Sequence, residues 1–576
     1  VKYTDLTLTD CTVTATAETP SYTQDDNGAA TTGFAVVSTD NTTGAATPAP
    51  KGTITIQGAN GSYKGQVGLA SLETVKTDYA DFADTTYAIS GGSFTKAVLP
   101  EYCATGFVPK ANDDGTYTVE EHKPMEYWTG FTADTKIGKT FATLDEAMAY
   151  AAKQTDASKR VVIAGDYTLT KDTSIPENVY VDVMGKLTIP AGVTMTVPAN
   201  AKRLGAWTGG TIEGEGMVLI EGRGNDFGES KVMINGTMST DMLIVPEGYI
   251  LAKNSNSYFA AKALFEITYS DGKVEKSGKD MNLTDATKVK LLEDVTDFAR
   301  SFGSTDKLSD NFVLDLGGHT LSGKNTATAD VLSTSVPMTI TNGTVKFAGP
   351  ATENAGALRT SADVTIASDV AIDGGVGYAI WTDGYGHTLT VNGTVGSNGS
   401  YAITSNGAEN GGLVADCNIT VNAGAVISAP NGVAIYHPEL GTVTINGGEI
   451  TGHTGIEMCA GKLVVKDGTI TSTGADDSNS DNVVLNGAAI SILDRSYPGG
   501  SPSAEITGGT FTSATAPAIR AYHWEYPNAT DWTDAGTKVN ISGGTFSSIP
   551  GNMNALCAAG YIPFKNADGT YGVTRP

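Results

Sequence analysis

The sequence is short of cysteine, of charged residues and of long apolar runs, and each shortage excludes a class of protein. Five cysteines in 576 residues are too few for a disulfide framework, so we expect free or individually buried thiols. No apolar run approaches the roughly 20 residues that cross a bilayer, so no membrane insertion is expected. Charged residues make up only 17 % of the chain and hydrophobic residues 40 %, which is too apolar a balance for a disordered protein.

Basic residues are scarce relative to acidic ones. The 37 Lys and Arg residues against 63 Asp and Glu residues give a formal net charge of −26 at pH 7. A chain without a basic stripe cannot neutralise phosphates, so nucleic acids and anionic membrane surfaces are excluded as partners. The surplus of acidic residues limits self-association, which predicts a monomer. Glycine is plentiful instead, with 69 residues, and many tight turns are therefore expected.

A closing module occurs twice in the sequence. Its copies begin with Ile-Ser-Gly-Gly-Ser/Thr-Phe, at 89–94 and at 541–546, and both end in Asp-Gly-Thr-Tyr. Internal repeats of this kind divide a chain into units. We therefore predict the end of a preceding solenoid repeat over 1–124 with its closing module at 89–124, a helix and a first solenoid segment over 125–250, a small β-hairpin insert over 251–287, a main solenoid over 288–540 and a second closing module over 541–576.

Short apolar strands recur between residues 338 and 541 and fall into three columns. The columns are Ile340, Ile366, Val391, Val421, Ile445, Val465, Ile506 and Ile541; then Val345, Val426, Ile450, Ile470, Phe511 and Phe546; then the Ala-Ile pairs at 379–380, 402–403, 434–435, 489–490 and 518–519. One such repeat cannot bury its apolar face alone, so stacked repeats with parallel strands are predicted. A string of β-sandwich domains, the alternative, would need longer and more strictly alternating strands.

Polar residues occupy equivalent turns after several of these strands. These residues are Asn392, Asn422, Asn446 and Asp467. In stacked repeats, side chains at equivalent turns lie one above the next, so we predict a polar ladder along the stack.

One helix interrupts the β pattern. Thr143 and Glu146 form a capping box ahead of the good helix formers at 147–152. We expect this helix to cover the open end of the solenoid segment that begins near residue 160, because exposed strand edges invite aggregation.

The closing module, the Thr143–Ala147 motif and the run Leu314–Leu321 resemble parts of large repeat-containing cell-surface proteins of Gram-positive gut bacteria. The resemblance covers most of 89–576. It implies an all-β fold of right-handed parallel β-helix (β-solenoid) segments of the pectate-lyase-like type, and right-handedness also agrees with the general rule for parallel crossovers. It further implies an extracellular, surface-attached protein. Because this superfold hosts lyases, hydrolases and adhesins, function has to be argued from sites.

The first residues, 1–9, alternate like a strand from the middle of a fold. We therefore expect the sequence to be a piece of a longer chain that forms a monomeric rod. Attachment to the cell surface is expected to lie in regions outside this sequence.

A variable connection follows each Ala-Ile pair and is the predicted binding surface. Loops on a rigid scaffold commonly carry binding sites, and aromatic rings flanked by polar groups suit a saccharide. The candidate ligand-binding residues are Trp381, Tyr385, Tyr436, His437, Tyr497, Arg520, His523, Trp524, Tyr526 and Trp532. In the alternative, these aromatic residues pack against one another and fold the loops onto the side of the solenoid.

Carboxylates on the same connections raise the alternative of catalysis. A pair of carboxylates at a suitable distance hydrolyses glycosidic bonds, and a lyase would add a base and acidic calcium ligands. The candidates are Asp383, Glu439, Asp494 and Glu525, with Glu457 nearby in sequence. The paired aspartates, Gly-His-Gly and Arg-x-Lys motifs of polygalacturonases are missing, so the sequence favours binding over catalysis.

A calcium loop is the one metal site that the sequence suggests. Asp477, Asn479 and Asp481 have the spacing of its first ligands, but Asn482 replaces the required glycine and Ala488 the required glutamate. A solvated acidic loop is the better interpretation, and no cofactor is expected. The sequence therefore predicts an adhesin that binds a glycan or a host surface protein. A polysaccharide lyase or glycoside hydrolase and a structural spacer without ligand are the alternatives.

Overall fold

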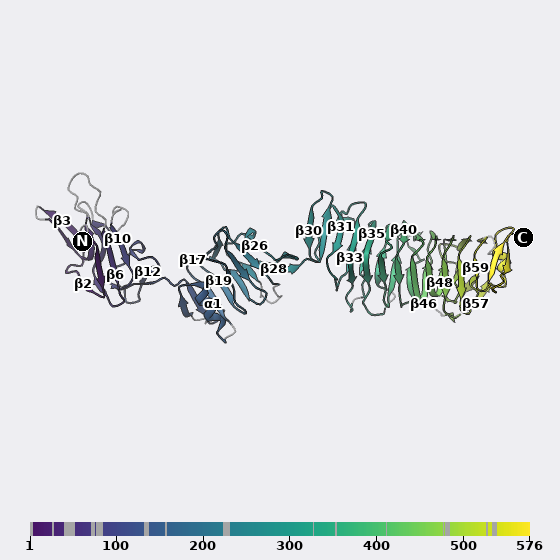
Figure 1. Ribbon diagram of the computed structural model, residues 1–576. Helices are drawn as coiled ribbons and strands as arrows, with labels where there is room; N and C mark the ends of the chain where they lie inside the picture. The colour runs from purple at the N-terminus through teal and green to yellow at the C-terminus, as the bar shows by residue number, and fades with distance from the viewer. Residues whose placement is uncertain are drawn as a thin grey trace. The chain divides into compact units, whose positions relative to one another are not determined.

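The computed structural model describes most of the chain. The described residues are 4–25, 28–39, 52–70, 75–76, 85–131, 137–155, 158–222, 231–326, 328–351, 354–410, 412–475, 477–478, 484–525, 528–532 and 538–576. They form two compact units, one of Val1–Glu247 with Leu251–Ala260 and one of Gly248–Ile250 with Ala261–Pro576. Strands dominate both units (Figure 1), and the large sheets are built mainly from parallel pairs, which confirms the all-β prediction.

The first part of the first unit contains four small sheets. In sheet order they are β1 (Leu6–Thr9), β6 (Gly52–Gln57) and β10 (Thr85–Ile89); β12 (Phe107–Ala111), β13 (Tyr117–Glu121), β11 (Ser93–Phe94), β7 (Ser62–Lys64) and β2 (Thr12–Thr14); β5 (Phe34–Thr39), β8 (Gln66–Ala70) and β9 (Val75–Lys76); and β3 (Ser21–Asp25) with β4 (Gly28–Thr32). A 3-10 helix, η2 (Pro100–Tyr102), precedes β12.

The remainder of the first unit contains three sheets of mostly parallel strands. In sheet order they are β15 (Ile137–Phe141), β14 (Met125–Trp128), β16 (Arg160–Ile163), β19 (Tyr180–Val183), β22 (Arg203–Ala206), β25 (Val232–Ile234), β28 (Ser257–Lys262) and β27 (Tyr249–Asn254); β17 (Asp166–Thr168), β20 (Lys186–Thr188) and β23 (Thr211–Glu213); and β18 (Thr173–Ser174), β21 (Thr194–Val197), β24 (Met217–Ile220) and β26 (Leu243–Ile244). The pairs β14–β15, β14–β16 and β25–β28 are antiparallel. A 3-10 helix, η3 (Thr240–Met242), leads into β26.

The predicted helix is present as α1 (Leu144–Ala152). Thr143 Oγ1 accepts a hydrogen bond from the Glu146 backbone N–H at 3.3 Å, as the capping motif requires. Its buried residues include Leu144 and Met148, and the helix packs against β14, β15 and β16. It therefore covers the strands at which the parallel stack begins.

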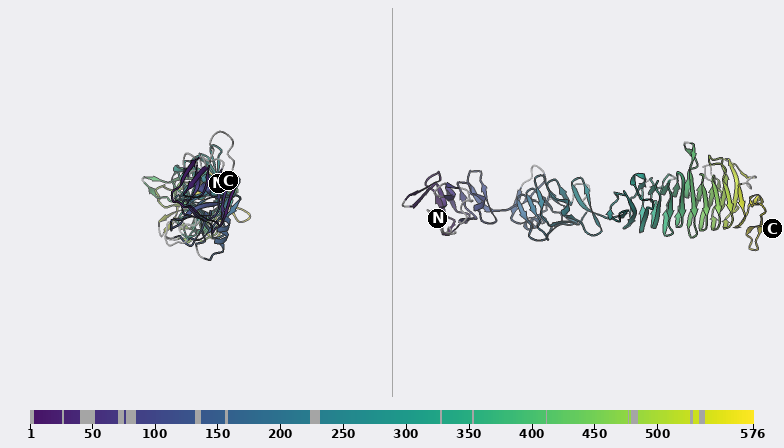
Figure 2. Two further views of the ribbon diagram at one scale, coloured as in Figure 1. Left: turned by 90° about the vertical axis from the view of Figure 1, so that its left-hand side faces the viewer. Right: turned by 90° about the horizontal axis from the view of Figure 1, so that it is seen from above.

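The second unit is dominated by one sheet of 29 strands that lie side by side (Figure 2). Most of its strands belong to three parallel ladders. The first contains β31 (Ala286–Leu291), β33 (Val313–Ser322), β35 (Met338–Lys346), β37 (Val364–Ile366), β40 (Tyr385–Val391), β45 (Asp416–Val421), β47 (Thr442–Ile445), β49 (Lys462–Val465), β54 (Ser503–Ile506) and β58 (Val539–Ile541). The second continues from the later residues of β33 and β35 through β38 (Val370–Asp373), β41 (Thr394–Gly396), β46 (Val426–His437), β48 (Glu449–Met458), β50 (Thr469–Ser472), β55 (Thr510–Ser513) and β59 (Thr545–Phe546).

The third ladder, here named the Ala-Ile ladder, carries the candidate site. It contains β32 (Arg300–Phe302), β34 (Leu332–Thr334), β36 (Gly356–Thr360), β39 (Tyr378–Thr382), β42 (Tyr401–Ser405), the later residues of β46 and β48, β53 (Ile490–Asp494) and β56 (Ile519–Glu525). β57 (Asn528–Asp531) pairs with β56 in antiparallel fashion. Smaller elements of this unit are η4 (Ser304–Asp306) and the two-stranded ribbons β43 (Glu409–Asn410) with β44 (Leu413–Val414) and β51 (Asp477–Ser478) with β52 (Val484–Leu485).

The apolar columns read from the sequence are register partners in these ladders. Ile340 pairs with Ile366, and the same column continues without a break to Ile541. One assignment is wrong. Ile427 occupies the second column and is buried, whereas Val426 is exposed. The connection from Val421 to Ile427 is one residue longer than the connection from Ile445 to Ile450 in the next repeat, and one extra residue moves a side chain to the other face of a strand.

The predicted polar ladder is present at three of its four positions. Asn422 Nδ2 donates to Asn392 Oδ1 at 2.8 Å, and Asn446 Nδ2 donates to Asn422 Oδ1 at 3.0 Å. Asp467 instead accepts from the backbone N–H of Gly468. A carboxylate has no N–H to pass the chain of hydrogen bonds on to the next repeat.

Both copies of the closing module adopt the same arrangement. β11 pairs with β13 and β59 pairs with β61 (Tyr571–Thr574), each in antiparallel fashion, after the parallel stack ends. The second copy also contains α2 (Met553–Leu556) and β60 (Ile562–Lys565). The predicted hairpin is β29 (Phe265–Tyr269) with β30 (Val274–Ser277), and β29 also pairs with β31. Phe265 and Ile267 belong to the main core, so this hairpin extends the large sheet.

All five cysteines are free, and Cys417, Cys459 and Cys557 are buried. Burial raises the pKa of the Cys417 and Cys459 thiols, which keeps them protonated and unreactive. In the described ranges, no helix is both long and apolar enough to cross a membrane.

Candidate binding surface on the Ala-Ile ladder

One outward-facing position recurs along the Ala-Ile ladder. Leu358 on β36 and the isoleucine of each later strand point into the core, and the next residue points away from it because strand side chains alternate. In register, this outward column consists of Arg359, Trp381, Thr404, Tyr436, Glu457, Ser491 and Arg520. Of this row only Arg359, Trp381 and Arg520 are partly exposed, because Thr404, Tyr436, Glu457 and Ser491 are buried under other residues.

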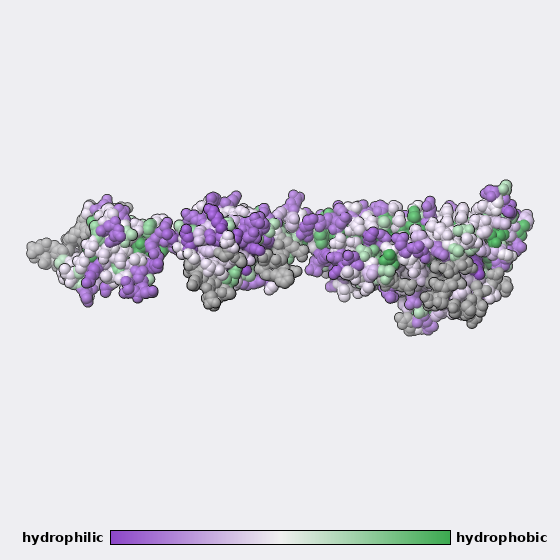
Figure 3. All heavy atoms as spheres, turned by 90° about the horizontal axis from the view of Figure 1, so that it is seen from below, coloured by the Kyte–Doolittle hydropathy of each residue, from purple (hydrophilic) through white to green (hydrophobic). Residues whose placement is uncertain are grey.

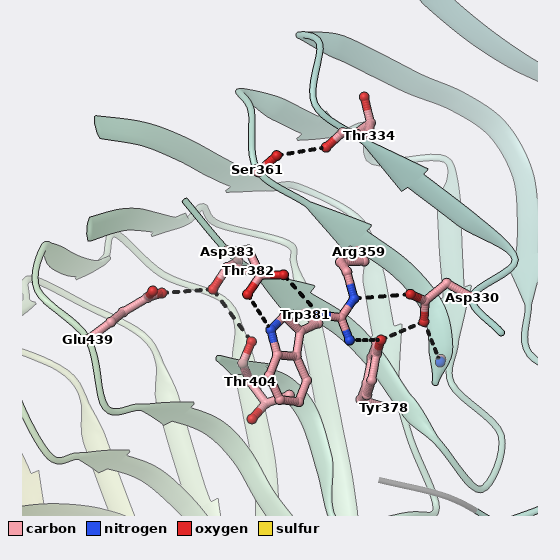
Figure 4. Close-up of polar contacts among 11 residues, drawn as sticks. Asp330, Thr334, Arg359, Ser361, Tyr378, Trp381, Thr382, Asp383, Thr404 and Glu439 are labelled. Atoms are coloured by element: carbon pink, nitrogen blue, oxygen red, sulfur yellow. Dashed lines mark hydrogen bonds and ion pairs between the residues drawn. The ribbon is translucent and has the colours of Figure 1, made fainter. Parts of the chain in front are cut away.

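The start of this row forms a hydrogen-bonded cluster, named here the Arg359 cluster: Asp330, Arg359, Tyr378, Trp381 and Asp383. The guanidinium of Arg359 donates from Nε to Asp330 Oδ2 (3.1 Å), from Nη1 to Asp383 Oδ2 (2.9 Å) and from Nη2 to the Tyr378 hydroxyl oxygen (3.0 Å). Trp381 Nε1 donates to Asp383 Oδ1 at 2.8 Å. Figure 4 shows Arg359 at the centre of these contacts.

Register explains how the cluster assembles. Arg359 on β36 and Trp381 on β39 are direct partners, and neighbouring strands lie about 4.8 Å apart. The guanidinium carbon accordingly lies 4.7 Å from the centre of the Trp381 ring, within the range of a cation–π contact. Asp383 follows β39 immediately, so the strand end places its carboxylate beside both groups.

The cluster is fixed yet open to solvent. The side chain of Asp383 is 38 % exposed and that of Arg359 is 33 % exposed. One guanidinium stands against two carboxylates, which leaves a formal charge of −1. Burial and the hydrogen bond to Asp330 raise the pKa of the Tyr378 hydroxyl, so this group remains a donor. Tyr385, two residues beyond Asp383, is 54 % exposed.

Several aromatic residues predicted to bind a ligand are buried instead. Tyr436 and Trp524 belong to a second hydrophobic cluster on the outer side of the ladder, and Trp532 packs into the main core. His437 points inward and is fully buried. These four side chains offer no ring face to solvent, so the prediction that they form a binding platform is corrected. The packing alternative describes them.

Other predicted residues lie on the surface but serve local contacts. The Tyr497 hydroxyl is 3.1 Å from that of Tyr436. His523 Nδ1 lies 3.3 Å from Asp494 Oδ2. Arg520 stacks over Tyr522, 4.3 Å from the ring centre, and borders a cavity of about 500 Å³. The structure thus does not gather them with Trp381 into one site.

Two predicted carboxylates are wholly buried. Glu439 accepts from Thr382 Oγ1 at 2.8 Å, on the side of β39 opposite to Trp381 (Figure 4). Burial raises its pKa to about 8 and lowers the pKa of His437 to about 4. Glu457 accepts from Cys459 Sγ at 3.7 Å and has no exposed surface. A glycosidic oxygen cannot reach either carboxylate, so the hypothesis that they are catalytic is corrected.

Some candidates fall outside what the structure describes. Tyr526, Asn479 and Asp481 are not among the described residues, and neither are the side chains of Glu525 and Asp477. Within the described part of the chain, no three His, Cys, Asp or Glu side chains are grouped closely enough to hold a metal ion.

Three members of the Arg359 cluster escaped the sequence analysis. Arg359, Tyr378 and Asp330 lie before the variable connections that follow the Ala-Ile pairs. The signal that could have found them is register, because Arg359 lies one repeat before Trp381 in the same column.

No known family model, curated protein or solved structure matches this chain.

Proposed function

We propose that this chain is a surface-attached, extracellular binding segment that recognises a glycan at the Arg359 cluster. Its second unit would be a right-handed parallel β-helix of the pectate-lyase-like type, which the parallel ladders and the resemblance to bacterial surface proteins support. The rigid stack would serve as a scaffold that presents the cluster, in the manner of an adhesin.

The observation that carries the proposal is a partly exposed set of polar and aromatic groups held rigidly in place. Exposed ion pairs contribute little to stability, so the fold gains little from so elaborate a network at its surface. A saccharide needs carboxylate oxygens that accept from hydroxyls, donors that bind ring oxygens, and a ring face for its C–H groups. Asp383, Arg359 and Trp381 supply these three kinds of contact, and preorganised groups lose little entropy on binding.

The surface of the second unit seen in Figure 3 also favours a polar ligand over a broad apolar partner. On the face drawn in Figure 3, apolar residues of the second unit lie in small separate spots among polar ones. Surfaces that dock large apolar partners usually show continuous patches of several hundred Å².

Catalysis on the same scaffold has less support. Asp383 is paired with Arg359, Asp494 is bonded to Ser501 and lies beside His523, and Glu439 is buried. A hydrolase needs two accessible carboxylates with separate roles, and these three do not provide such a pair.

A glycan array probed with the full chain and two variants tests the proposal. We expect Trp381→Ala to weaken glycan binding at least about tenfold, since central aromatic contacts commonly contribute more than 1.4 kcal/mol. Phe564→Ala is the matched control, because Phe564 is also a partly exposed aromatic residue of the second unit but lies on β60, away from the cluster. This variant should bind as the unmodified chain does.

Three results would contradict the proposal. An array without binders, with circular dichroism showing folded protein, would favour a protein ligand or a spacer. Equal loss in both variants would place binding elsewhere. Cleavage products from a bound glycan would favour the hydrolase or lyase alternative.

A further inference from the structure

The first unit contains a second charged and aromatic cluster, which the sequence analysis did not find. We name it the Arg160–Arg203 cluster, and it consists of Trp128, Phe131, Arg160, Asp182, Arg203 and Trp207. β16, β19 and β22 are successive parallel strands. Stacking places Arg160, Asp182 and Arg203 on neighbouring strands, with the aromatic residues around them.

The cluster contains two guanidinium groups but one carboxylate. Arg160 Nε donates to Asp182 Oδ2 at 2.6 Å, and Arg203 donates to Asp182 from Nε (3.0 Å) and Nη2 (3.1 Å). The side chains of Arg160 and Arg203 are 5 % and 9 % exposed, and that of Asp182 is fully buried. Among the described residues, one positive charge therefore lies in a largely dry site without a carboxylate of its own, which is unfavourable unless something else compensates it.

Three N–H groups of the cluster have no hydrogen-bond acceptor among the described residues. Arg160 Nη1 donates to the Gly130 carbonyl at 3.2 Å, but no hydrogen bond joins Arg160 Nη2 or Arg203 Nη1 to another described residue. The indole Nε1 of Trp207 is buried and has no partner among the described residues. All three groups are donors, so only an acceptor satisfies them.

Aromatic rings enclose these donors. The guanidinium carbon of Arg160 lies 4.8 Å from the Trp128 ring centre and 4.9 Å from that of Phe131. That of Arg203 lies 5.1 Å from the Trp207 ring centre. Phe131 covers both arginines while being 46 % exposed itself. Because exposed side chains change rotamer within nanoseconds, a turn of this ring gives a ligand access to the arginines.

We infer that the Arg160–Arg203 cluster binds a singly charged oxyanion group, a carboxylate or a sulfate ester, carried by a small ligand. Such a group accepts from the guanidinium and indole N–H groups and neutralises the surplus charge. The Arg359 cluster has the opposite balance, with two carboxylates and one guanidinium, so the two clusters select different ligands. This inference is independent of the proposed glycan site.

Saturation-transfer NMR on the full chain tests the inference, with the methyl protons of methyl sulfate and acetate as probes. Dimethyl sulfone, which is uncharged, is the control ligand. We expect at least one anion to bind with a dissociation constant of the order of millimolar, as is usual for so few atoms. The anion that binds more tightly identifies the group that the site prefers.

Variants locate the binding. Trp207→Phe removes one N–H but keeps an aromatic ring, so it should weaken the anion about three- to tenfold. Trp532→Phe, the same change in the core of the second unit, should leave anion binding unchanged. Arg203→Met should abolish anion binding. If that variant misfolds, the weaker binding expected for Trp207→Phe still tests whether the anion binds at this cluster. Transfer to both anions no greater than to dimethyl sulfone, or equal binding in the two tryptophan variants, would overturn the inference.

Discussion

Replacing Glu439 by glutamine should stabilise the second unit at pH 8, by roughly 3–5 kcal/mol, and leave it nearly unchanged at pH 4.5. Burial raises the pKa of Glu439 from 4.5 to about 8. Below about pH 4.5 the folded and unfolded chains both hold this proton. Between about pH 4.5 and pH 8 only the folded chain holds it, so stability is lost at about 1.4 kcal/mol per pH unit as the pH rises. Glutamine has the same shape and no proton to lose.

His437 produces the opposite slope over part of this range. Burial lowers the pKa of His437 from 6.5 to about 4. Between about pH 6.5 and pH 4, His437 is therefore protonated in the unfolded chain but not in the folded chain. Stability is therefore lost as the pH falls from about 6.5 to about 4. His437 Nδ1 and Glu439 Oε1 are 4.0 Å apart, and the two slopes nearly cancel between about pH 4.5 and pH 6.5. In the Glu439→Gln variant only the effect of His437 remains, so the stability of the second unit should fall as the pH is lowered from about 6.5 to about 4.5.

Hydrogen exchange of the β46 and β48 amides measures these effects, because it reports the free energy of opening close to Glu439. Glu449→Gln is the matched control, since Glu449 is an exposed glutamate on β48. Its pH profile should follow that of the unmodified chain. Parallel profiles for the unmodified chain and Glu439→Gln from pH 4.5 to pH 8 would contradict a neutral, buried Glu439.

The repeat architecture could be predicted from the sequence because its cause is local. Each strand presents an apolar residue at a fixed place in the repeat, and stacking identical places is the only way to bury them all. Ile340 to Ile541 therefore became register partners as expected. The assignment of Val426 was wrong because the connections between the first two columns differ in length from repeat to repeat, and a sequence pattern does not show where a turn takes up an extra residue.

The candidate site was less predictable because burial of an outward side chain depends on what covers it. Trp381 and Tyr436 occupy equivalent places in the Ala-Ile ladder, yet Trp381 is partly exposed and Tyr436 is buried. The difference arises from packing with residues far along the chain, including Trp524 and Leu493. The burial of the Glu439 carboxylate likewise depends on contacts between distant parts of the chain, since its hydrogen-bond partner Thr382 lies 57 residues away in the sequence.

Asp182→Asn should destabilise the first unit by roughly 3–5 kcal/mol, because it leaves two buried guanidinium groups without a counter-charge. The amide keeps the size of the side chain, so the effect is electrostatic. Hydrogen exchange of the β16, β19 and β22 amides measures the change. Asp166→Asn is the matched control, since Asp166 is an exposed aspartate on β17 that lies 3.9 Å from Lys186, and exposed pairs contribute about 0–1 kcal/mol. Equal effects of the two substitutions would contradict the assigned role of Asp182.

Replacing all three charged residues separates folding from binding in this cluster. Buried ion clusters exchanged for apolar residues of similar volume are often as stable as before, or more stable by about 1–4 kcal/mol. We therefore expect the triple variant Arg160→Met, Asp182→Leu, Arg203→Met to exchange its β19 amides no faster than the unmodified chain while losing the methyl sulfate or acetate signal. Such a result would mean that the fold does not need these charges and that a ligand does. A triple variant as unstable as Asp182→Asn would assign the charges to folding instead.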